Sequence, residues 1–215
     1  MRLRDGGSGM EKRTGIREKA LKDLQHSKVL MLDGHFDYGN GYHGRAYLNP
    51  HQLFRQPSTI WRFAQDLLDI VPSDLLHSVE LVAGPATGGA LLAHTLAGLL
   101  DSRRSLSHPP CLFAPFHHTS QGGFSIRDFY RSELKGKRVL LADDVRNTGE
   151  TFERCATLVK ASGGAVLATV EIYDRMEAVF DVGVPNFALA EYRAPANHRV
   201  ADCPLCTAGA PIARF

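Results

Sequence analysis

The amino-acid sequence predicts an α/β protein with a doubly wound, mainly parallel β-sheet. Short apolar segments typical of buried strands recur along the chain, and segments with helical apolar spacing lie between them. Gly-rich or polar turns follow several of these strands. Alternation of this kind places helices on both faces of a parallel sheet. The length of 215 residues suits one domain.

Before residue 79 the expected elements are a flexible leader (1–10), an amphipathic helix (11–27), a strand (29–32), a hairpin or loop (34–49) and a helix that opens at 56–59. Apolar residues at helical spacing predict both helices. Ser58 is the expected N-cap of the second helix, because its hydroxyl can accept a hydrogen bond from a free amide of the first turn.

From residue 79 onward, strands and helices alternate. The expected strands cover 79–83, 111–114, 138–142, 165–173 and 187–191, and the expected helices cover 90–100 and 151–161. Residues 119–137 are polar and show no sustained apolar face, so we expect a loop there.

Composition excludes several functional classes. An apolar fraction of 44% and a net charge of +2 exclude a disordered chain and a general nucleic-acid binder, which concentrates positive charge. No stretch approaches the roughly 20 consecutive apolar residues of a membrane helix, and the leader lacks the apolar core of a signal peptide. We therefore expect a cytoplasmic protein that acts on a small molecule, with neither nucleic acid nor membrane as a partner.

The most informative segment covers residues 138–151. Two adjacent carboxylates, Asp143 and Asp144, directly follow a buried strand, and a turn containing Thr148 precedes a helix. Ligands of open parallel sheets bind beyond the carboxyl ends of strands, and a helix N-terminus can bind phosphate. The carboxylates would repel that phosphate, so they suit sugar hydroxyls or a hydrated magnesium ion. A phosphorylated sugar would suit both the carboxylates and the helix N-terminus. The alternative is an acidic pair that is solvated and binds no ligand.

This segment resembles the phosphoribosyl pyrophosphate signature of the type I phosphoribosyltransferases. The resemblance implies a single domain over residues 11–215, with a small hood from segments near 28–55 and 174–215. It implies that Asp143 and Asp144 hold the ribose hydroxyls and Mg²⁺. The 5′-phosphate would lie on the loop formed by Arg146, Asn147, Thr148, Gly149, Glu150 and Thr151. Arg146-Asn147 and Glu150 depart from the usual pattern, and an acid at Glu150 weakens the attraction for phosphate.

A second turn follows the strand at 79–83. It consists of Gly84, Pro85, Ala86, Thr87, Gly88 and Gly89. Glycine allows the backbone to approach a ligand closely, and the start of a helix favours an anion. The turn resembles the pyrophosphate-binding turn of the orotate phosphoribosyltransferase branch, without the lysine often found there. A tight turn with no ligand is the alternative.

Two further regions resemble the orotate branch. Residues 34–49 resemble its N-terminal hood segment, which implies base contacts from Phe36 and Tyr47. Residues 174–177 resemble a motif whose arginine contacts the carboxylate of the base. A guanidinium at Arg175 can fork onto a carboxylate, although a surface arginine is the alternative. Orotate is the leading base, another nucleobase is its rival, and the resemblance implies a homodimer.

The loop after the second parallel strand departs most from the orotate branch. That branch carries lysines there, whereas this chain has no lysine between Lys28 and Lys135. Pyrophosphate accumulates charge as it leaves, and cations must stabilise it. We assign this catalytic role to Arg127 and Arg131, together with Mg²⁺ and the acidic pair. The alternatives are a phosphoribosyl pyrophosphate-binding regulatory protein, a catalytically divergent homologue, or a transferase for a different base.

Cys203 and Cys206 form a Cys-x-x-Cys motif that begins five residues after His198. A structural zinc site needs four ligands, and only one cysteine pair is local. The sequence therefore favours two unligated thiols or a labile disulfide over a metal site. A metal site would need ligands from another chain, or from Cys111 or Cys155.

Overall fold

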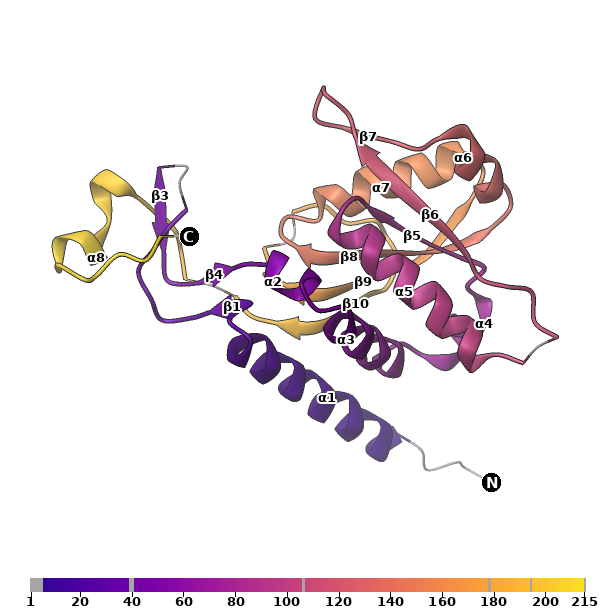
Figure 1. The fold of residues 1–215 in the computed structure, drawn as a ribbon, viewed down its shortest axis with the longest axis horizontal. Helices are drawn as coiled ribbons and strands as arrows, with labels where there is room; N and C mark the ends of the chain where they lie inside the picture. Colours follow the sequence, from indigo (N-terminus) through magenta and orange to yellow (C-terminus); the bar gives the residue numbers. More distant parts are fainter. Residues whose placement is uncertain (1–5, 39–40, 106, 178, 194, 215) are drawn as a thin grey trace.

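The computed structural model describes residues 6–38, 41–105, 107–177, 179–193 and 195–214. An α/β core lies beside a smaller part that projects from one end (Figure 1). The core contains a six-stranded sheet in the order β10-β9-β8-β5-β6-β7. Its strands are β5 (Leu81–Pro85), β6 (Leu112–His118), β7 (Phe124–Ser125), β8 (Arg138–Arg146), β9 (Ala165–Asp174) and β10 (Asn186–Glu191).

Strand order places a topological switch in the middle of this sheet. Strands β10, β9, β8, β5 and β6 pair in parallel, and β7 pairs antiparallel with the end of β6. The five parallel strands confirm the predicted ones. The chain passes from β5 to its neighbour β6 and then crosses to β8 on the other side of β5. Ligands of doubly wound sheets bind at such a switch, beyond the carboxyl ends of the strands.

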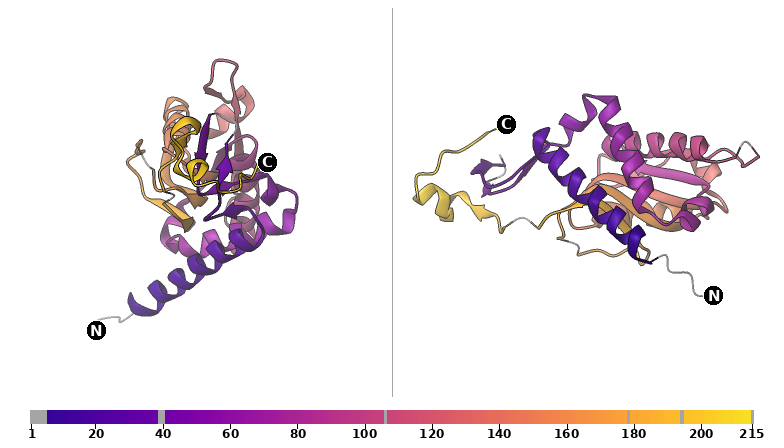
Figure 2. Two further views of the ribbon diagram at one scale, coloured as in Figure 1. Left: turned by 90° about the vertical axis from the view of Figure 1, so that its left-hand side faces the viewer. Right: turned by 90° about the horizontal axis from the view of Figure 1, so that it is seen from below.

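Helices cover both faces of the sheet (Figures 1 and 2). One face carries α1 (Gly6–His26), α3 (Pro57–Ile70) and α5 (Gly88–Arg103), and the other carries α6 (Asp128–Leu134) and α7 (Glu150–Ala161). Strand β8 contributes to both layers, because alternate side chains of a strand point to opposite faces. Leu140 packs with the first group of helices, and Leu141 packs with the second.

Segments from both ends of the chain form the projecting part. We call residues 35–38, 41–46 and 197–214 the hood. It contains β2 (Phe36–Asp37), β3 (Tyr42–Gly44), β11 (His198–Arg199), a 3₁₀ turn (Val200–Asp202) and α8 (Pro204–Thr207). Strand β3 lies between β11 and β2, so the C-terminal tail pairs with the N-terminal hairpin. Strands β1 (Leu30–Met31) and β4 (Tyr47–Leu48) connect the hood to the core.

Some local predictions were wrong. Helix α1 begins at Gly6, so residues 6–10 are helical although we expected them in the flexible leader; extending a formed helix adds one hydrogen bond per residue. Residues 1–5 of the predicted leader lie outside the described residues. Helix α3 is capped at Gln56, and Pro57 begins it because its φ is preset for a first helical position. Ser58 is therefore inside the helix.

Short elements were also missed by the sequence patterns. The region 119–137 contains β7 and α6, and α2 (His51–Phe54) and α4 (Ser73–Ser78) are further short helices. Each is too short to generate a recognisable apolar period. Among the described residues, no helix combines the length and the apolar character that crossing a membrane requires.

Candidate active site

The acidic pair lies at the carboxyl end of β8. Asp143 is buried, and its Oδ1 accepts a hydrogen bond from the backbone N–H of Asp144 at 2.9 Å. Burial raises the pKa of Asp143 well above its ordinary range, and the neighbouring carboxylate of Asp144 raises it further. The charged pair is therefore costly in the free protein, so hydroxyl donors or a cation would stabilise it.

The predicted glycine turn meets this acidic pair across the switch point. A Cβ atom added at Gly88 would lie 2.5 Å from Oδ2 of Asp144, and one at Gly89 would lie 2.8 Å from Oδ1 of Asp143. Helix α5 begins at Gly88, so its N-terminus reaches the carboxylates only because the turn has no side chains there. The peptide between Ala86 and Thr87 in this turn is cis.

The predicted phosphate loop encloses a cavity of about 180 Å³. Its lining consists of Asp143, Val145, Arg146, Asn147, Thr148, Gly149, Glu150, Thr151 and Phe152. Gly149 has φ +87°, and a Cβ there would lie 2.5 Å from the carbonyl oxygen of Phe180. The position therefore requires glycine on two grounds. Because α7 begins at Glu150, its free amides lie on this cavity and suit an anion.

Both unusual charges of the loop are paired within the chain. The guanidinium of Arg146 lies 3.1 Å from the carboxylate of Asp174. Glu150 is paired with Arg154 at 2.5 Å, and Arg154 also donates to the carbonyl of Gly122. Arg146 thus lines the phosphate cavity while its charge is directed toward Asp174, and Arg154 offsets the acid at Glu150.

A second cavity of about 330 Å³ adjoins the first and shares two lining residues with it. Its lining consists of Leu30, Tyr38, Ala46, Tyr47, Leu48, Pro50, Val145, Asn147, Tyr173, Arg175 and Asn197. The predicted base contacts Tyr47, in β4, and Arg175, which directly follows β9, both line it. Arg175 is a quarter exposed and forms an ion pair with Glu177 at 3.1 Å. Tyrosine side chains together with a guanidinium suit a flat, anionic ring.

Several predicted residues line neither cavity: Asp144 and the turn at 84–88, which meet each other beside the phosphate cavity, and also Phe36, Arg127 and Arg131. Phe36 is buried in the hood, with its ring centroid 5.8 Å from that of Tyr47, so it supports this tyrosine without lining the cavity. Arg127 caps α6 and lines neither cavity. Arg131 donates to the carbonyl of Ile126 at 3.3 Å and likewise lines neither.

Sequence reasoning missed the three other polar residues that line the second cavity, Tyr38, Tyr173 and Asn197. Tyr38 lies in the aromatic region already singled out, and its hydroxyl donates to the carbonyl of Ala46 at 2.6 Å. Burial raises its pKa, so the hydroxyl is neutral and can act as a donor. Asn197 and Tyr173 had no motif to mark them, because only the folded chain brings them to the cavity.

Comparisons with known proteins find related sequences and structures, although no family model matches the chain. A curated orotate phosphoribosyltransferase from Erythrobacter litoralis is 32% identical over 178 residues, which are 83% of this chain and 86% of that protein. Another, from Caldanaerobacter subterraneus, is 28% identical over 198 residues, 92% and 96% of the two chains.

Solved structures give the same answer at the level of the fold. An orotate phosphoribosyltransferase from Aeropyrum pernix superposes with a TM-score of 0.61 at 24% identity, covering 80% of this chain and 93% of that one. An adenine phosphoribosyltransferase from Trypanosoma brucei gives 0.57 at 16% identity, covering 89% and 82%.

The fold is therefore that of the type I phosphoribosyltransferases. The sequence identity of 32% across most of both chains is more specific than the fold. The chain belongs to the orotate phosphoribosyltransferase family, which confirms the resemblance stated above.

Proposed function

We propose that this protein transfers the phosphoribosyl group of phosphoribosyl pyrophosphate to orotate and releases pyrophosphate. The observation that carries the proposal is the meeting of the acidic pair with the side-chain-free turn at Gly88, beside the phosphate cavity. One polyanionic sugar can contact all three at once. The adjoining aromatic cavity supplies room for the base.

Each part of the site has a role in this reaction. The amides at the start of α7 would bind the 5′-phosphate, and the turn at 84–88 would bind the pyrophosphate. Asp143 and Asp144 would accept hydrogen bonds from the ribose hydroxyls. The ring of orotate would lie against the tyrosine side chains with its carboxylate on Arg175. The bond from the anomeric carbon to the base then forms as the bond from that carbon to pyrophosphate breaks.

The donor set fits a magnesium ion. Carboxylate oxygens of Asp143 and Asp144 are the ligand type that Mg²⁺ prefers, with substrate phosphates and water completing its shell. A divalent cation would also relieve the repulsion that raises the pKa of Asp143. When bound, the ion would neutralise charge on the departing pyrophosphate. Arg127 and Arg131 as added cations, a homodimer and a cytoplasmic location stay predictions.

A spectrophotometric assay tests the proposal. The protein is incubated with Mg²⁺, phosphoribosyl pyrophosphate and orotate, and loss of orotate absorbance is followed, with adenine in a parallel reaction as the control base. We expect turnover with orotate only. The lysine-poor loop favours one other function, a regulatory protein that binds the sugar diphosphate without reaction. Calorimetric binding of phosphoribosyl pyrophosphate without orotate turnover would establish that function and reject ours.

A variant pair tests the assignment of the acidic residues. Asp144→Asn should abolish binding of phosphoribosyl pyrophosphate in calorimetry, because a carboxylate accepts hydrogen bonds from hydroxyls more strongly than an amide does. Asp74→Asn, on the exposed face of α4, is the matched control and should bind normally. Unchanged binding by Asp144→Asn would show that the acidic pair lies outside the sugar site.

A further inference from the structure

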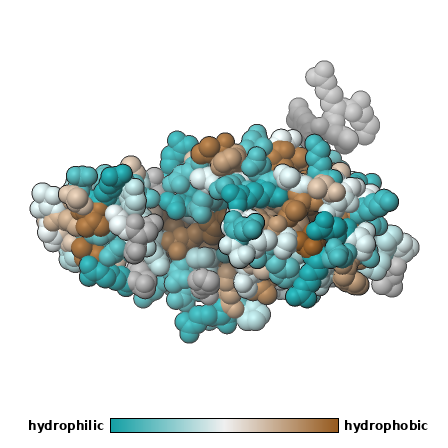
Figure 3. Space-filling view, turned by 90° about the horizontal axis from the view of Figure 1, so that it is seen from above, coloured by the Kyte–Doolittle hydropathy of each residue, from teal (hydrophilic) through white to brown (hydrophobic). Residues whose placement is uncertain are grey.

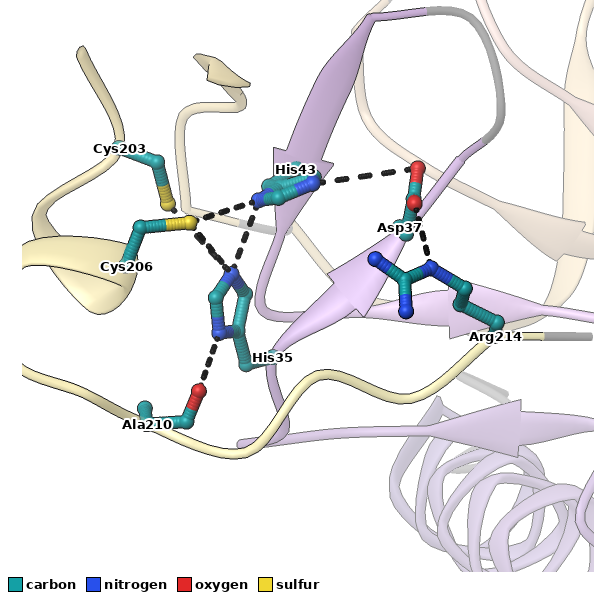
Figure 4. Close-up of polar contacts among 7 residues, drawn as sticks. All are labelled: His35, Asp37, His43, Cys203, Cys206, Ala210 and Arg214. Carbon is teal, nitrogen blue, oxygen red and sulfur yellow. Dashed lines mark hydrogen bonds and ion pairs between the residues drawn. The ribbon is translucent and has the colours of Figure 1, made fainter. Parts of the chain in front are cut away.

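The hood contains a cluster of four side chains that can all act as metal ligands. His35, His43, Cys203 and Cys206 place one ligand atom each within 4.8 Å of the others, and Figure 4 shows the four converging on one point. The histidines belong to the N-terminal hairpin region, Cys203 is the N-cap of α8, and Cys206 lies within that helix. His35, His43 and Cys203 are buried, and Cys206 is partly exposed.

We propose that these four residues bind a structural zinc ion. Zinc–sulfur bonds of about 2.3 Å and zinc–nitrogen bonds of about 2.0–2.1 Å in a tetrahedral site separate a sulfur from a nitrogen by about 3.6 Å. Both sulfurs lie 3.6 Å from Nε2 of His35, and the sulfur of Cys206 lies 3.3 Å from Nδ1 of His43. These three sulfur–nitrogen distances are therefore close to those that a tetrahedral zinc ion imposes.

The outer nitrogens of both histidine rings face oxygen atoms of the kind that orient metal ligands, within hydrogen-bond distance for His35. Nδ1 of His35 lies 2.9 Å from the carbonyl oxygen of Ala210, which can only accept, so Nδ1 carries the hydrogen. Nε2 of His43 lies 3.9 Å from a carboxylate oxygen of Asp37. Carbonyl and carboxylate partners on the far nitrogen are typical of zinc-bound histidines.

Two ring nitrogens of the cluster also face each other. Nε2 of His35 carries no hydrogen, because Nδ1 carries it, and this nitrogen lies 2.9 Å from Nδ1 of His43. Without a metal, Nδ1 of His43 can donate to that lone pair, and with the hydrogen of His43 on the nitrogen that faces Asp37, both lone pairs are available to a cation. A zinc ion there satisfies both nitrogens and both sulfurs, and a set of two cysteines and two histidines is a closed tetrahedral zinc site.

The hood also lacks the apolar core that would hold it together. Figure 3 shows it as a lobe at one end of the molecule. Its buried apolar side chains among the described residues are Phe36 and Cys203, and neither belongs to the two hydrophobic clusters of the core. Units this small need a staple such as a disulfide or a metal. Zinc would join the C-terminal tail to the N-terminal hairpin.

The staple would act on one wall of the base cavity. Tyr38 and Asn197 both line that cavity, and the hydroxyl of Tyr38 donates a hydrogen bond of 3.2 Å to the amide oxygen of Asn197. Tyr38 immediately follows β2, and Asn197 immediately precedes β11, so each is close in sequence to a strand of the stapled sheet. This consequence rests on the proposed function, whereas the zinc site itself does not.

Metal analysis of the purified protein tests the site without any substrate. After equilibration with Zn²⁺ and dialysis, we expect one zinc per chain by mass spectrometry. Replacement by Co²⁺ should give the visible bands of a tetrahedral ion and the near-ultraviolet bands of thiolate–cobalt bonding. Thiol titration should find two cysteines protected until a chelator is added. Absence of zinc, with two freely reactive thiols or a disulfide between them, would overturn the proposal.

Single substitutions identify the ligands. Cys206→Ser and His43→Ala should each lose most of the bound zinc. Cys111→Ser, which alters a buried thiol of the core, and His198→Ala, which alters a hood histidine outside the cluster, are matched controls and should keep it. Full zinc content in Cys206→Ser and His43→Ala would refute the assignment, and the cobalt spectrum of the unaltered protein remains decisive if a variant fails to fold.

Discussion

Arg175 is the side chain on which selection of the base depends most directly. A hydrogen bond to a charged group contributes roughly 1.5–3 kcal/mol, which corresponds to a factor of about 10–150 in binding. The ion pair with Glu177 moves the expected effect toward the upper end of that range. Without Arg175, the unpaired Glu177 would repel the carboxylate of orotate. We therefore expect Arg175→Ala to raise the KM for orotate about 100-fold.

Steady-state kinetics with two acceptors isolate this contact. The KM for phosphoribosyl pyrophosphate should change by less than about twofold, because the phosphate cavity is lined by other residues. Uracil lacks the carboxylate, so kcat/KM for uracil should change little in Arg175→Ala. Arg175→Lys keeps the positive charge but cannot form two parallel hydrogen bonds to a carboxylate. Its KM for orotate should therefore lie between that of the unaltered protein and that of Arg175→Ala. Arg193→Ala removes an exposed arginine that donates to the carbonyl of Met176, and serves as the control.

The loss of kcat/KM with orotate, compared with the loss with uracil, shows whether Arg175 contacts the carboxylate. Equal losses with orotate and uracil would mean that Arg175 supports the fold of the site without contacting the carboxylate. A rise in the KM for phosphoribosyl pyrophosphate as large as that for orotate would place Arg175 at the sugar diphosphate. Either result would refute the placement of orotate described above.

Three further substitutions test the site and the core. Gly88→Ala should weaken binding of phosphoribosyl pyrophosphate at least about tenfold in calorimetry, because the added methyl group displaces a carboxylate of the acidic pair. Gly98→Ala, on the same helix, adds a methyl group into open space and should bind normally. Gly149→Ala should lower the melting temperature more than Gly183→Ala, because both incur the left-handed penalty of about 1–2 kcal/mol but only Gly149 meets a carbonyl oxygen. Burial raises the pKa of Glu171 from 4.5 to about 7, so the folded state retains a proton that the unfolded state loses, and the free energy of unfolding falls as pH rises through this window. Glu171→Gln should remove that fall, worth up to about 3 kcal/mol, in urea unfolding at pH 5 and pH 8; an unchanged pH dependence would contradict the assignment.

The sequence predicted what is encoded locally. Parallel strands are buried on both faces, so they appear as continuous apolar runs such as 138–142, and all five were found. The acidic pair and the phosphate loop were found because strand, turn and helix follow one another directly. Helix α6 was missed because it buries only Leu134, which sets up no period.

What the sequence could not show depends on contacts between distant segments. The Cys-x-x-Cys motif lacked a second pair of ligands until β11 paired with β3 and brought His43 beside the tail. His35 carries no motif of its own and reaches the cluster through the same sheet. The local histidine, His198, lies outside the cluster. No pattern along the chain distinguishes these three histidines, because only the pairing of the strands does.

The arginines near the phosphate loop are all engaged in ion pairs within the described residues. Arg146 and Arg154, the arginines on or beside the phosphate loop, are held by Asp174 and Glu150. Neither is therefore free to replace the lysines that the loop after β6 lacks. The helix N-termini and a magnesium ion would have to supply most of the stabilisation of the departing pyrophosphate. Because Arg154 contacts both Glu150 and the carbonyl of Gly122 in that loop, the unusual acid of the phosphate loop is linked to the segment that contains no lysine.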